Sequence, residues 1–281
     1  MATETSAEPK GERKMLKVGF IGAGNMGFAL AKAVKSCGLE TEIFISSRTK
    51  EKAAAAAEKI GAVATNNKTV AAECEVIFLA VKPNVISAVA EEIKDFLSSR
   101  NDFLFVTMAA GVSMDKISSY LGFDCPIIRI MPNTPVSIGE GMTLWCANEH
   151  VSAEQKSTFE KLLEKSGVTD EIKESLIDAG SAVSGCGPAF VYIFAEALAD
   201  GAVECGLPRD KAIEYAAQTL VGAAKMVTES GEHPEKLKDA VCSPGGSTIA
   251  GVHALEDGAF RACAMNAVKA SFDKTKILGN S

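Results

Sequence analysis

The chain has 281 residues, of which 47% are hydrophobic and 23% charged, so it can form one large domain or two of ordinary size with a substantial core. Its 29 basic and 36 acidic side chains give a formal net charge of −7. This acidic balance, with no basic run, argues against binding to nucleic acid or to an anionic membrane surface. Any anionic ligand must therefore be held by local groups.

Residues 1–14 form a small, polar and charged segment without the apolar core of a secretory signal. Glu4, Glu8 and Glu12 also argue against an organelle transit peptide, because such peptides contain few acidic residues. We therefore expect a disordered tail at 1–14 and a cytoplasmic protein.

Residues 16–175 alternate short apolar runs with helical patterns. The runs are rich in β-branched and aromatic residues, which is typical of strands buried on both faces of a parallel sheet. The expected strands are 16–21, 42–46, 76–81, 103–108, 127–130 and 142–146. The clearest expected helices are 25–37, 49–60, 84–97 and 152–165. This alternation predicts a doubly wound α/β domain over residues 15–175.

Residues 176–281 lack the strand pattern and predict an all-α domain. Prolines near the predicted helix starts and glycines near the ends support this interpretation. The expected helices are 188–205, 209–230, 234–241, 248–257 and 260–278. The first of them is apolar around most of its circumference, so we expect it to pack against a second subunit in a homo-oligomer.

The same helix, within the apolar stretch 188–206, carries Glu196, Asp200 and Glu204. Carboxylates four residues apart form one polar stripe on a helix, which a lipid-facing helix does not tolerate. No membrane span is therefore predicted. The stripe is either a solvated face, which we favour, or a source of protons for catalysis.

Cysteine and histidine patterns give no sign of a metal site. The eight cysteines form no CxxC pair and mostly lie in apolar runs, so they are interpreted as reduced core residues. The three histidines form no HExxH pattern. The sequence predicts no bound metal.

A GxGxxG motif directly follows the first predicted strand and opens the first predicted helix. Gly22 permits the tight turn, Gly24 lets the backbone approach a pyrophosphate, and Gly27 lets helix and strand pack closely. The helix N-terminus would hold the pyrophosphate through free N–H groups, including those of Asn25 and Met26. The motif predicts a Rossmann-type dinucleotide site, and the alternative is a glycine-rich turn without a ligand.

The end of the second strand indicates which cofactor binds. An NAD site usually has Asp or Glu at this position, but the chain has Ser47 and Arg48, with no carboxylate until Glu51. A guanidinium and a hydroxyl suit a 2′-phosphate, so NADPH is the predicted cofactor and NADH a weaker one. The alternative is that Arg48 is only a solvated surface charge.

Two further turns follow predicted strands and should line the same crevice, because ligands gather at the carboxyl ends of strands. Their small residues would let nicotinamide and ribose approach the backbone. The expected contacts are Ala80, Val81, Lys82 and Pro83 in one turn and Ala109, Ala110 and Gly111 in the other. Lys82 is alternatively a catalytic acid or an ordinary surface lysine.

In the second half, the loop Ser243-Pro-Gly-Gly-Ser-Thr248 runs into a predicted helix. It exposes N–H groups and three hydroxyls in a small space, an arrangement that suits a carboxylate. The alternative is an ordinary interhelical turn with a Ser or Thr N-cap.

Six motifs together resemble the pyrroline-5-carboxylate reductase family in order and spacing, over about residues 16–276. They are GAGNMG from Gly22, SSRT from Ser46, AVKPN from Ala80, RIMPNTP from Arg129, SGCGPAF from Ser184 and SPGGSTI from Ser243. The resemblance implies reduction of L-1-pyrroline-5-carboxylate to L-proline with NAD(P)H, the last step of proline biosynthesis. It also implies an N-terminal Rossmann domain, a helical dimerisation domain, and dimers assembled into a larger ring, a decamer.

The resemblance also assigns roles to individual residues. Ser243, Ser247 and Thr248, with the amides of Gly245 and Gly246, are expected to hold the substrate carboxylate. Asn67 matches a position that contacts the adenosine ribose. Ser247 stands where relatives often carry Thr or Ala, which keeps its amide contact but puts its side-chain contact in doubt.

Reduction of a cyclic imine needs a hydride at the imine carbon and a proton on nitrogen. Thr248 is our candidate for the catalytic hydrogen bond to the ring nitrogen, either donating directly or through water. Most of the rate would come from positioning the ring by its carboxylate.

Two other functions fit parts of the sequence. A β-hydroxyacid dehydrogenase would need a lysine on a helix of the second domain, but none follows SGCGPAF until Lys211. A non-catalytic NADP(H)-binding sensor would have no need of the intact SPGGST loop.

Overall fold

The computed structural model describes residues 15–279, and the tail predicted at 1–14 lies outside these residues. The chain divides into two compact units, and each is described by itself. The sheet unit contains the residues up to Gly185 and those from Thr275 onward. The helical unit is Cys186–Lys274.

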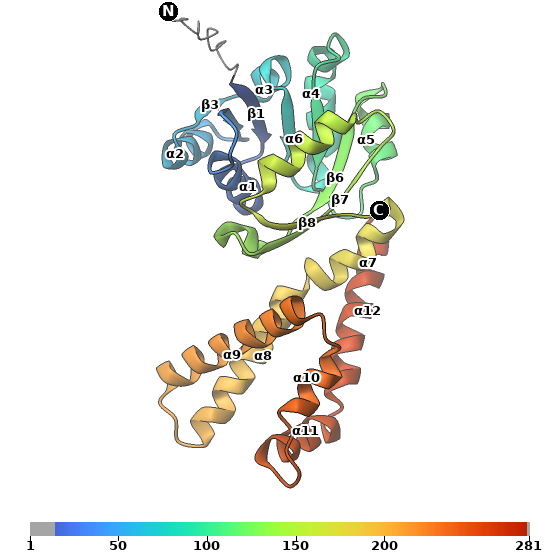
Figure 1. The fold of residues 1–281 in the computed structure, drawn as a ribbon. Coiled ribbons are helices and arrows are strands. Elements are labelled where there is room, and N and C mark those ends of the chain that lie inside the picture. The colour runs from blue at the N-terminus through green and yellow to red at the C-terminus, as the bar shows by residue number, and fades with distance from the viewer. Residues whose placement is uncertain (1–14, 280–281) are drawn as a thin grey trace, which may run out of the picture. The chain divides into compact units, whose positions relative to one another are not determined.

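The sheet unit is built on eight strands in the order β3-β2-β1-β4-β5-β6-β7-β8 (Figure 1). The strands are β1 (Leu16–Ile21), β2 (Thr41–Ser46), β3 (Val63–Thr65), β4 (Val76–Leu79), β5 (Leu104–Thr107), β6 (Ile127–Met131), β7 (Gly141–Ala147) and β8 (Gly167–Glu171). All neighbours are parallel except β6 and β7. The strand order reverses between β1 and β4, and a crevice at such a point is where open α/β sheets bind ligands.

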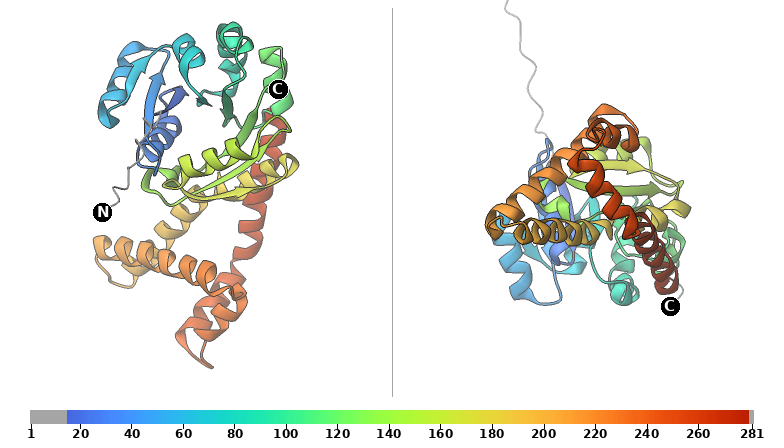
Figure 2. Two further views of the ribbon diagram at one scale, coloured as in Figure 1. Left: turned by 45° about the horizontal axis from the view of Figure 1, so that its top comes forward. Right: turned by 90° about the horizontal axis from the view of Figure 1, so that it is seen from below.

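Helices connect the strands and cover both faces of the sheet (Figure 2). They are α1 (Asn25–Lys35), α2 (Lys50–Ile60), α3 (Asn67–Glu73), α4 (Ile86–Ser98), α5 (Met114–Leu121), α6 (Ala153–Leu163) and α7 (Glu174–Ser184), with short 3-10 turns at Pro83–Val85 and Thr134–Ile138. The doubly wound α/β fold predicted from the sequence is confirmed.

Two hydrophobic cores lie on opposite faces of the sheet because successive strand residues point to opposite sides. In β4, Phe78 packs with the residues of α1, α2 and α6, where Phe20 stacks on its ring at 4.6 Å between centroids. Its neighbour Ile77 packs with the residues of α3, α4, α5 and α7. Strands buried on both faces explain the nearly unbroken apolar runs of the sequence.

The structure adds elements that the hydrophobic pattern did not indicate. They are the strands β3 and β8 and the helices α3, α5 and α7. β3 has only three residues and is mostly exposed, and β8, with the sequence GVTDE, has no buried residue. Such short, polar edge strands give little hydrophobic signal. The antiparallel step from β6 to β7 departs from the expected all-parallel sheet because the two strands are joined by a short connection.

Helix α7 belongs to the sheet unit, so the two units divide at 185/186, ten residues after the domain boundary proposed from the sequence. α7 packs on β7, where Leu144 lies so close to Gly180 that a Cβ there would meet Leu144 Cδ1 at 2.3 Å.

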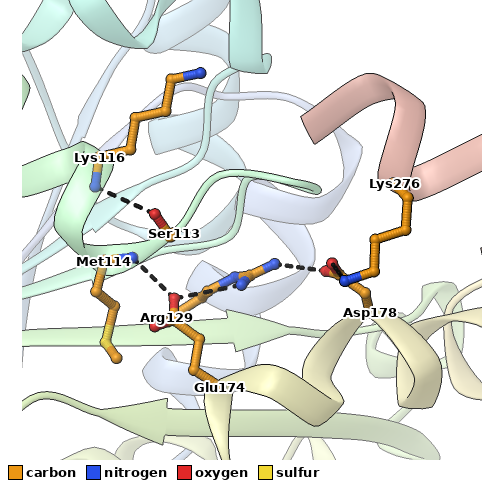
Figure 3. Close-up of polar contacts among 7 residues, drawn as sticks. All are labelled: Ser113, Met114, Lys116, Arg129, Glu174, Asp178 and Lys276. Carbon is orange, nitrogen blue, oxygen red and sulfur yellow. Dashed lines mark hydrogen bonds and ion pairs between the residues drawn. The ribbon is translucent and has the colours of Figure 1, made fainter. Parts of the chain in front are cut away.

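A buried charge cluster fastens α7 to the sheet (Figure 3). The guanidinium of Arg129 in β6 contacts Glu174 Oε1 at 3.3 Å and Asp178 Oδ1 at 2.8 Å. Glu174 Oε1 also accepts the amide of Met114, and Lys276 Nζ lies 3.5 Å from Asp178 Oδ2. One buried arginine thereby connects β6, the start of α5, α7 and the last turns of the chain.

The helical unit contains α8 (Gly187–Glu204), α9 (Arg209–Ser230), α10 (Pro234–Ala240), α11 (Ser247–Asp257) and most of α12 (Phe260–Gly279). α8 and α9 pack side by side (Figure 1). Their buried core is small and consists of Ala199, Ala212 and Ala216. Many large apolar side chains of the unit are exposed in the single chain, including Ile193 at 66% and Met265 at 72%.

One helical stretch, Glu174–Glu204, is long and apolar enough by composition to cross a membrane. Its most apolar window of 18 residues has a mean hydropathy of 1.4. The sequence analysis predicted no membrane span, so this stretch departs from that prediction by its length and composition. Only 11% of the window is buried within the chain, so its apolar surface is open. The carboxylates on which the expectation rested, Glu196, Asp200 and Glu204, are exposed on α8.

All eight cysteines are free, but the expectation that they are core residues holds only for Cys74, Cys125 and Cys146, which are buried. Cys205 and Cys263 are exposed in the single chain, and the other three are half-buried. Burial raises the pKa of the Cys74 and Cys125 thiols to about 12 and that of Cys146 to about 11. Such thiols remain protonated and behave as small core residues.

Candidate functional site

The turn after β1 requires glycine at two positions. Gly22 has a φ of +114°, and a Cβ there would lie 2.3 Å from the carbonyl oxygen of Ala80. A Cβ on Gly27 would lie 2.4 Å from the Gly22 carbonyl oxygen and 2.8 Å from Ala80 Cβ. These contacts bring the start of α1 close to the ends of β1 and β4, as the motif predicted.

Gly24 meets a different requirement. It is the N-cap of α1, with no side-chain cap and no acidic residue in the first turn, and a Cβ there would have no atom within 4 Å. The packing of the protein therefore leaves this glycine free, and its missing side chain opens the approach to the helix N-terminus. The amides of Asn25, Met26 and Gly27 lie in the first turn, where helical N–H groups lack intrahelical partners and attract anions.

A cavity of about 880 Å³ opens beside this turn, between the ends of β1, β2 and β4 and the helix α4. Five predicted cofactor residues line it: Gly22, Ser47, Arg48, Asn67 and Val81. Gly24 and Asn25 line a smaller cavity of about 200 Å³ between α1 and α2. The other predicted contacts, which lie outside both linings, are Met26, Gly27, Ala80, Lys82, Pro83, Ala109, Ala110 and Gly111.

The cavity wall also contains residues that the sequence analysis did not single out. Val85, Ala88, Val89 and Glu92 follow one another at spacings of three, one and three residues, so they share one face at the start of α4. Helical periodicity applied to this segment would have placed them together. Lys50 adds a second cation close in sequence to Arg48.

A short chain of hydrogen bonds crosses the cavity wall. The buried Ser46 hydroxyl at the end of β2 donates to Asn67 Oδ1 at 2.7 Å, and Asn67 Nδ2 donates to Glu92 Oε2 at 2.8 Å. Asn67 therefore has a fixed orientation, with its amide oxygen toward the sheet and its amide nitrogen toward α4. The cavity combines cations at Arg48 and Lys50 with a single carboxylate at Glu92.

The two turns after β4 and β5 are placed as expected at the strand ends. Lys82 is exposed and caps the 3-10 turn with its carbonyl, which accepts the Val85 amide at 3.1 Å. Ala109 is buried, and Gly111 has a φ of +73°, which favours glycine.

The SPGGST loop connects α10 to α11 in the helical unit. Gly245 has a φ of +71°, and the Gly246 amide donates to the Ser243 carbonyl at 3.0 Å. Gly246 is the N-cap of α11 and makes no side-chain cap, so the loop is not the Ser- or Thr-capped turn considered as an alternative. The amides of Ser247 and Thr248 lie in the first turn of α11, available to an anion.

Glycine at 246 also keeps the loop compact. A Cβ there would lie 2.4 Å from Ser243 Oγ, so a larger residue would displace that hydroxyl. Ser243, Gly245, Ser247 and Thr248 are exposed in the single chain. The loop thus brings a hydroxyl, two glycines and a helix N-terminus together. The Gly246 amide, expected to hold a carboxylate, is bonded within the loop to the Ser243 carbonyl.

Arg261 braces the two helices on either side of this loop. It contacts Glu235 of α10 at 2.7 Å and Glu256 of α11 at 2.6 Å. Hydrogen bonds from Lys238 and Arg261 lower the pKa of Glu235 to about 2, so this carboxylate is ionised at neutral pH. The pKa of the Arg261 guanidinium is raised by Glu256 and Glu235 in turn.

The residues considered for a β-hydroxyacid dehydrogenase and for a proton source form ion pairs with neighbouring side chains. Lys211, the first lysine after SGCGPAF, lies in α9 and contacts Glu214 at 2.9 Å. Asp200 of the carboxylate stripe pairs with Arg209. Within residues 15–279, no group of three or more His, Cys, Asp or Glu is arranged to hold a metal ion.

Comparison with known proteins finds a family match in each part of the chain. Residues 174–278 match the family model for pyrroline-5-carboxylate reductase dimerisation, and residues 17–111 match the model for NADP oxidoreductase, coenzyme F420-dependent. The membrane-length stretch Glu174–Glu204 lies inside the first of these matches.

Similar proteins extend over nearly the whole chain. Pyrroline-5-carboxylate reductase 3 of Danio rerio is 41% identical over 94% of this chain and 92% of its own length, and the Escherichia coli (strain K12) enzyme is 41% identical over 94% and 99%. The Plasmodium falciparum pyrroline carboxylate reductase structure with NADP bound has a TM-score of 0.85 at 34% identity, over 95% of this chain and 100% of that one. The resemblance seen in the six motifs is therefore confirmed, and the chain belongs to the pyrroline-5-carboxylate reductase family.

Proposed function

We propose that this chain is a pyrroline-5-carboxylate reductase that reduces L-1-pyrroline-5-carboxylate to L-proline with NADPH. The observation that carries the proposal is the identity of 41% with curated reductases of this name over 94% of the chain. The nucleotide cavity of the sheet unit and the intact SPGGST loop of the helical unit support it.

The residues around the cavity fit an NADP cofactor. Gly24 leaves the N-terminus of α1 open to a pyrophosphate, and Arg48 offers a guanidinium beside Ser47 for a 2′-phosphate. NADPH, when bound, supplies the hydride that reaches the imine carbon. The preference for NADPH over NADH rests on Arg48 and on the absence of a carboxylate at the end of β2.

The substrate is held by its carboxylate in the SPGGST loop. The hydroxyl of Ser243, the amide of Gly245, and the first-turn amides of Ser247 and Thr248 supply the donors. The Gly246 amide is bonded to the Ser243 carbonyl and shapes the loop. Fixing the carboxylate orients the ring, and positioning of this kind lowers the barrier without a strong acid or base.

Thr248 is proposed to hydrogen-bond the ring nitrogen and to pass the proton that this nitrogen gains on reduction. A hydroxyl is a weak acid, so it would relay the proton from water. The exposed position of Thr248 in the first turn of α11 gives water access to it.

The test is imine-dependent loss of NADPH absorbance at 340 nm by wild type, Thr248→Ala and Thr228→Ala. Thr228 is an exposed threonine of α9 whose hydroxyl bonds its own helix, so it is a matched control. Thr248→Ala is expected to lower kcat/KM for the imine by about 100-fold, and Thr228→Ala to leave it unchanged. Full kcat/KM in Thr248→Ala would refute the role of this hydroxyl.

The apolar, exposed surface of the helical unit supports a dimer formed through it, with α8 in the interface. Dimers would then assemble into a larger ring, a decamer. We propose that a partner subunit, and not lipid, covers the apolar stretch at Glu174–Glu204, as expected for an enzyme that works in the cytoplasm.

A further inference from the structure

Among the described residues, Glu92 is the one carboxylate that lines the nucleotide cavity. It belongs to none of the sequence motifs described above. It belongs to α4, and Ser47 and Arg48, the two residues that follow β2, line the same cavity. The Ser46–Asn67–Glu92 hydrogen bonds connect it to the last residue of β2 in two steps of 2.7 and 2.8 Å. The Glu92 carboxylate and the end of β2 are thus joined through the Asn67 side chain in the wall of one cavity.

That position has a known meaning in Rossmann folds. An acid at the end of β2 accepts a hydrogen bond from the ribose 2′-hydroxyl of NAD, and its negative charge repels the 2′-phosphate of NADP. The present chain has Ser47 and Arg48 there. Glu92 brings a carboxylate to the same region from a different element.

The orientation of Glu92 suits this role. Asn67 Nδ2 donates to Oε2 only, which leaves Oε1 as an acceptor on a side chain that lines the cavity. Because the buried Ser46 hydroxyl fixes the Asn67 amide, Asn67 in turn restrains the Glu92 rotamer. A restrained carboxylate binds a hydroxyl at a smaller cost in side-chain entropy than a free one.

We propose that Glu92 is a specificity-determining residue that favours a ribose 2′-hydroxyl over a 2′-phosphate and so offsets part of the NADPH preference conferred by Arg48. This inference rests on the proposed reductase function. Its consequence is an enzyme that keeps a usable affinity for NADH although it lacks the customary acid after β2.

The experiment compares Glu92→Gln with Glu91→Gln. Gln at 92 keeps the shape of the side chain and an oxygen that can accept from Asn67, but it loses the charge. Glu91 is the neighbouring exposed glutamate of the same helix; it pairs with Lys94 and does not line the cavity, so the control removes the same charge from the same helix.

Dissociation constants of NADPH and NADH are measured by calorimetric titration without imine, and kcat/KM is measured with each nucleotide. In Glu92→Gln, we expect NADH to bind more weakly and NADPH more tightly, so that the NADPH-to-NADH affinity ratio rises about fivefold. Glu91→Gln should keep the wild-type ratio.

An unchanged or lower ratio in Glu92→Gln, or an equal rise in both variants, would overturn the role of Glu92 while leaving the reductase function intact. Wild-type protein that bound neither nucleotide would overturn both. Unchanged melting temperatures of the variants would show that a shift in the ratio comes from the cavity and not from a loss of folding.

Discussion

Three glycines follow β1, and the structure separates their roles. Gly22 lies against the Ala80 backbone, and Gly27 lies against the Gly22 carbonyl and Ala80 Cβ, so a side chain at either position would disturb the fold. Gly24 has open space around it and a φ of −76°, which any residue adopts. Only Gly24 can therefore be changed to test ligand binding without disturbing the protein.

Gly24→Ala is expected to fold normally and to bind NADPH poorly. The added methyl meets no protein atom within 4 Å, but it occupies the approach to the N-terminus of α1. The KM for NADPH should rise at least about tenfold, with a melting temperature within about 2 °C of wild type. The matched control is Gly38→Ala, whose methyl makes ordinary contact with Glu164 away from the cavity. An unchanged KM in Gly24→Ala would mean that the pyrophosphate binds elsewhere.

Arg129 is a residue whose importance is structural. Its side chain is only 5% exposed and its Nε has no hydrogen-bond partner, so the guanidinium depends on Glu174 and Asp178 (Figure 3). Removing one partner of a buried ion pair leaves an uncompensated charge, which costs more than the pair itself contributes.

Asp178→Ala should lower the free energy of unfolding by about 3 kcal/mol. Lys276→Met, which removes the exposed partner of the same carboxylate, should cost less than about 1 kcal/mol. Urea unfolding followed by fluorescence measures this, because Trp145 is the only tryptophan and pairs with Ile130 beside Arg129 in the sheet. Equal losses of unfolding free energy in the two variants would contradict the claim that the buried ion pair of Arg129 stabilises the fold.

At the scale of elements, hydrophobic periodicity predicted the parts of the fold that bury apolar side chains. β1 and α9 begin and end at the predicted residues, because uninterrupted apolar runs and flanking proline and glycine mark them clearly. β3, β8 and α3 were missed because they are short and carry few buried residues. Their formation depends on neighbours in the sheet, which no local pattern encodes.

The candidate sites show the same division. The GxGxxG turn and the SPGGST loop could be recognised because backbone geometry demands particular residues at fixed spacing. Glu92 could not, since its role arises from contact between α4 and residues far away in sequence. Likewise, the sequence does not show that Arg261 joins α10 to α11.

Arg261→Met is expected to raise the KM for the imine about threefold, because the helices that flank the SPGGST loop lose their common ion pair. The KM for NADPH should stay constant. Salt should weaken these exposed ion pairs, because the Debye length at 0.5 M NaCl is only about 4 Å. The wild-type KM for the imine should therefore approach that of the variant at this salt concentration. Lys236→Met, which removes only a pair with Glu232, is the control. A similar KM in both variants would argue against bracing by Arg261.

At the scale of the whole molecule, the helical unit has too small a core to account for its apolar residues. Its buried cluster contains three alanines, whereas Tyr192, Ile193 and Met265 are each more than half exposed in the single chain. Exposed apolar surface of this kind marks a site of interaction with another protein or with a membrane. The family match over residues 174–278 is to a dimerisation region, which explains why the unit is built in this way.

Ile193→Asp should therefore weaken the dimer and move the sedimenting mass toward the 29.4 kDa of one chain. A charge buried at a subunit interface without a partner costs several kcal/mol. Val168→Asp, at an equally exposed apolar position in β8 of the sheet unit, should leave the mass unchanged. Sedimentation velocity of both variants decides between them, and an unaltered assembly in Ile193→Asp would exclude α8 from the interface.

The most direct test of the reductase function follows both nucleotide and product in one reaction. Purified protein is mixed with L-1-pyrroline-5-carboxylate and NADPH deuterated on the transferred position, and the amino acid formed is identified by chiral chromatography and mass. We predict L-proline carrying one deuterium at the former imine carbon, formed in equal amount to the NADP+ released. Oxidation of NADPH without proline, or no imine-dependent oxidation at all, would contradict the proposed function.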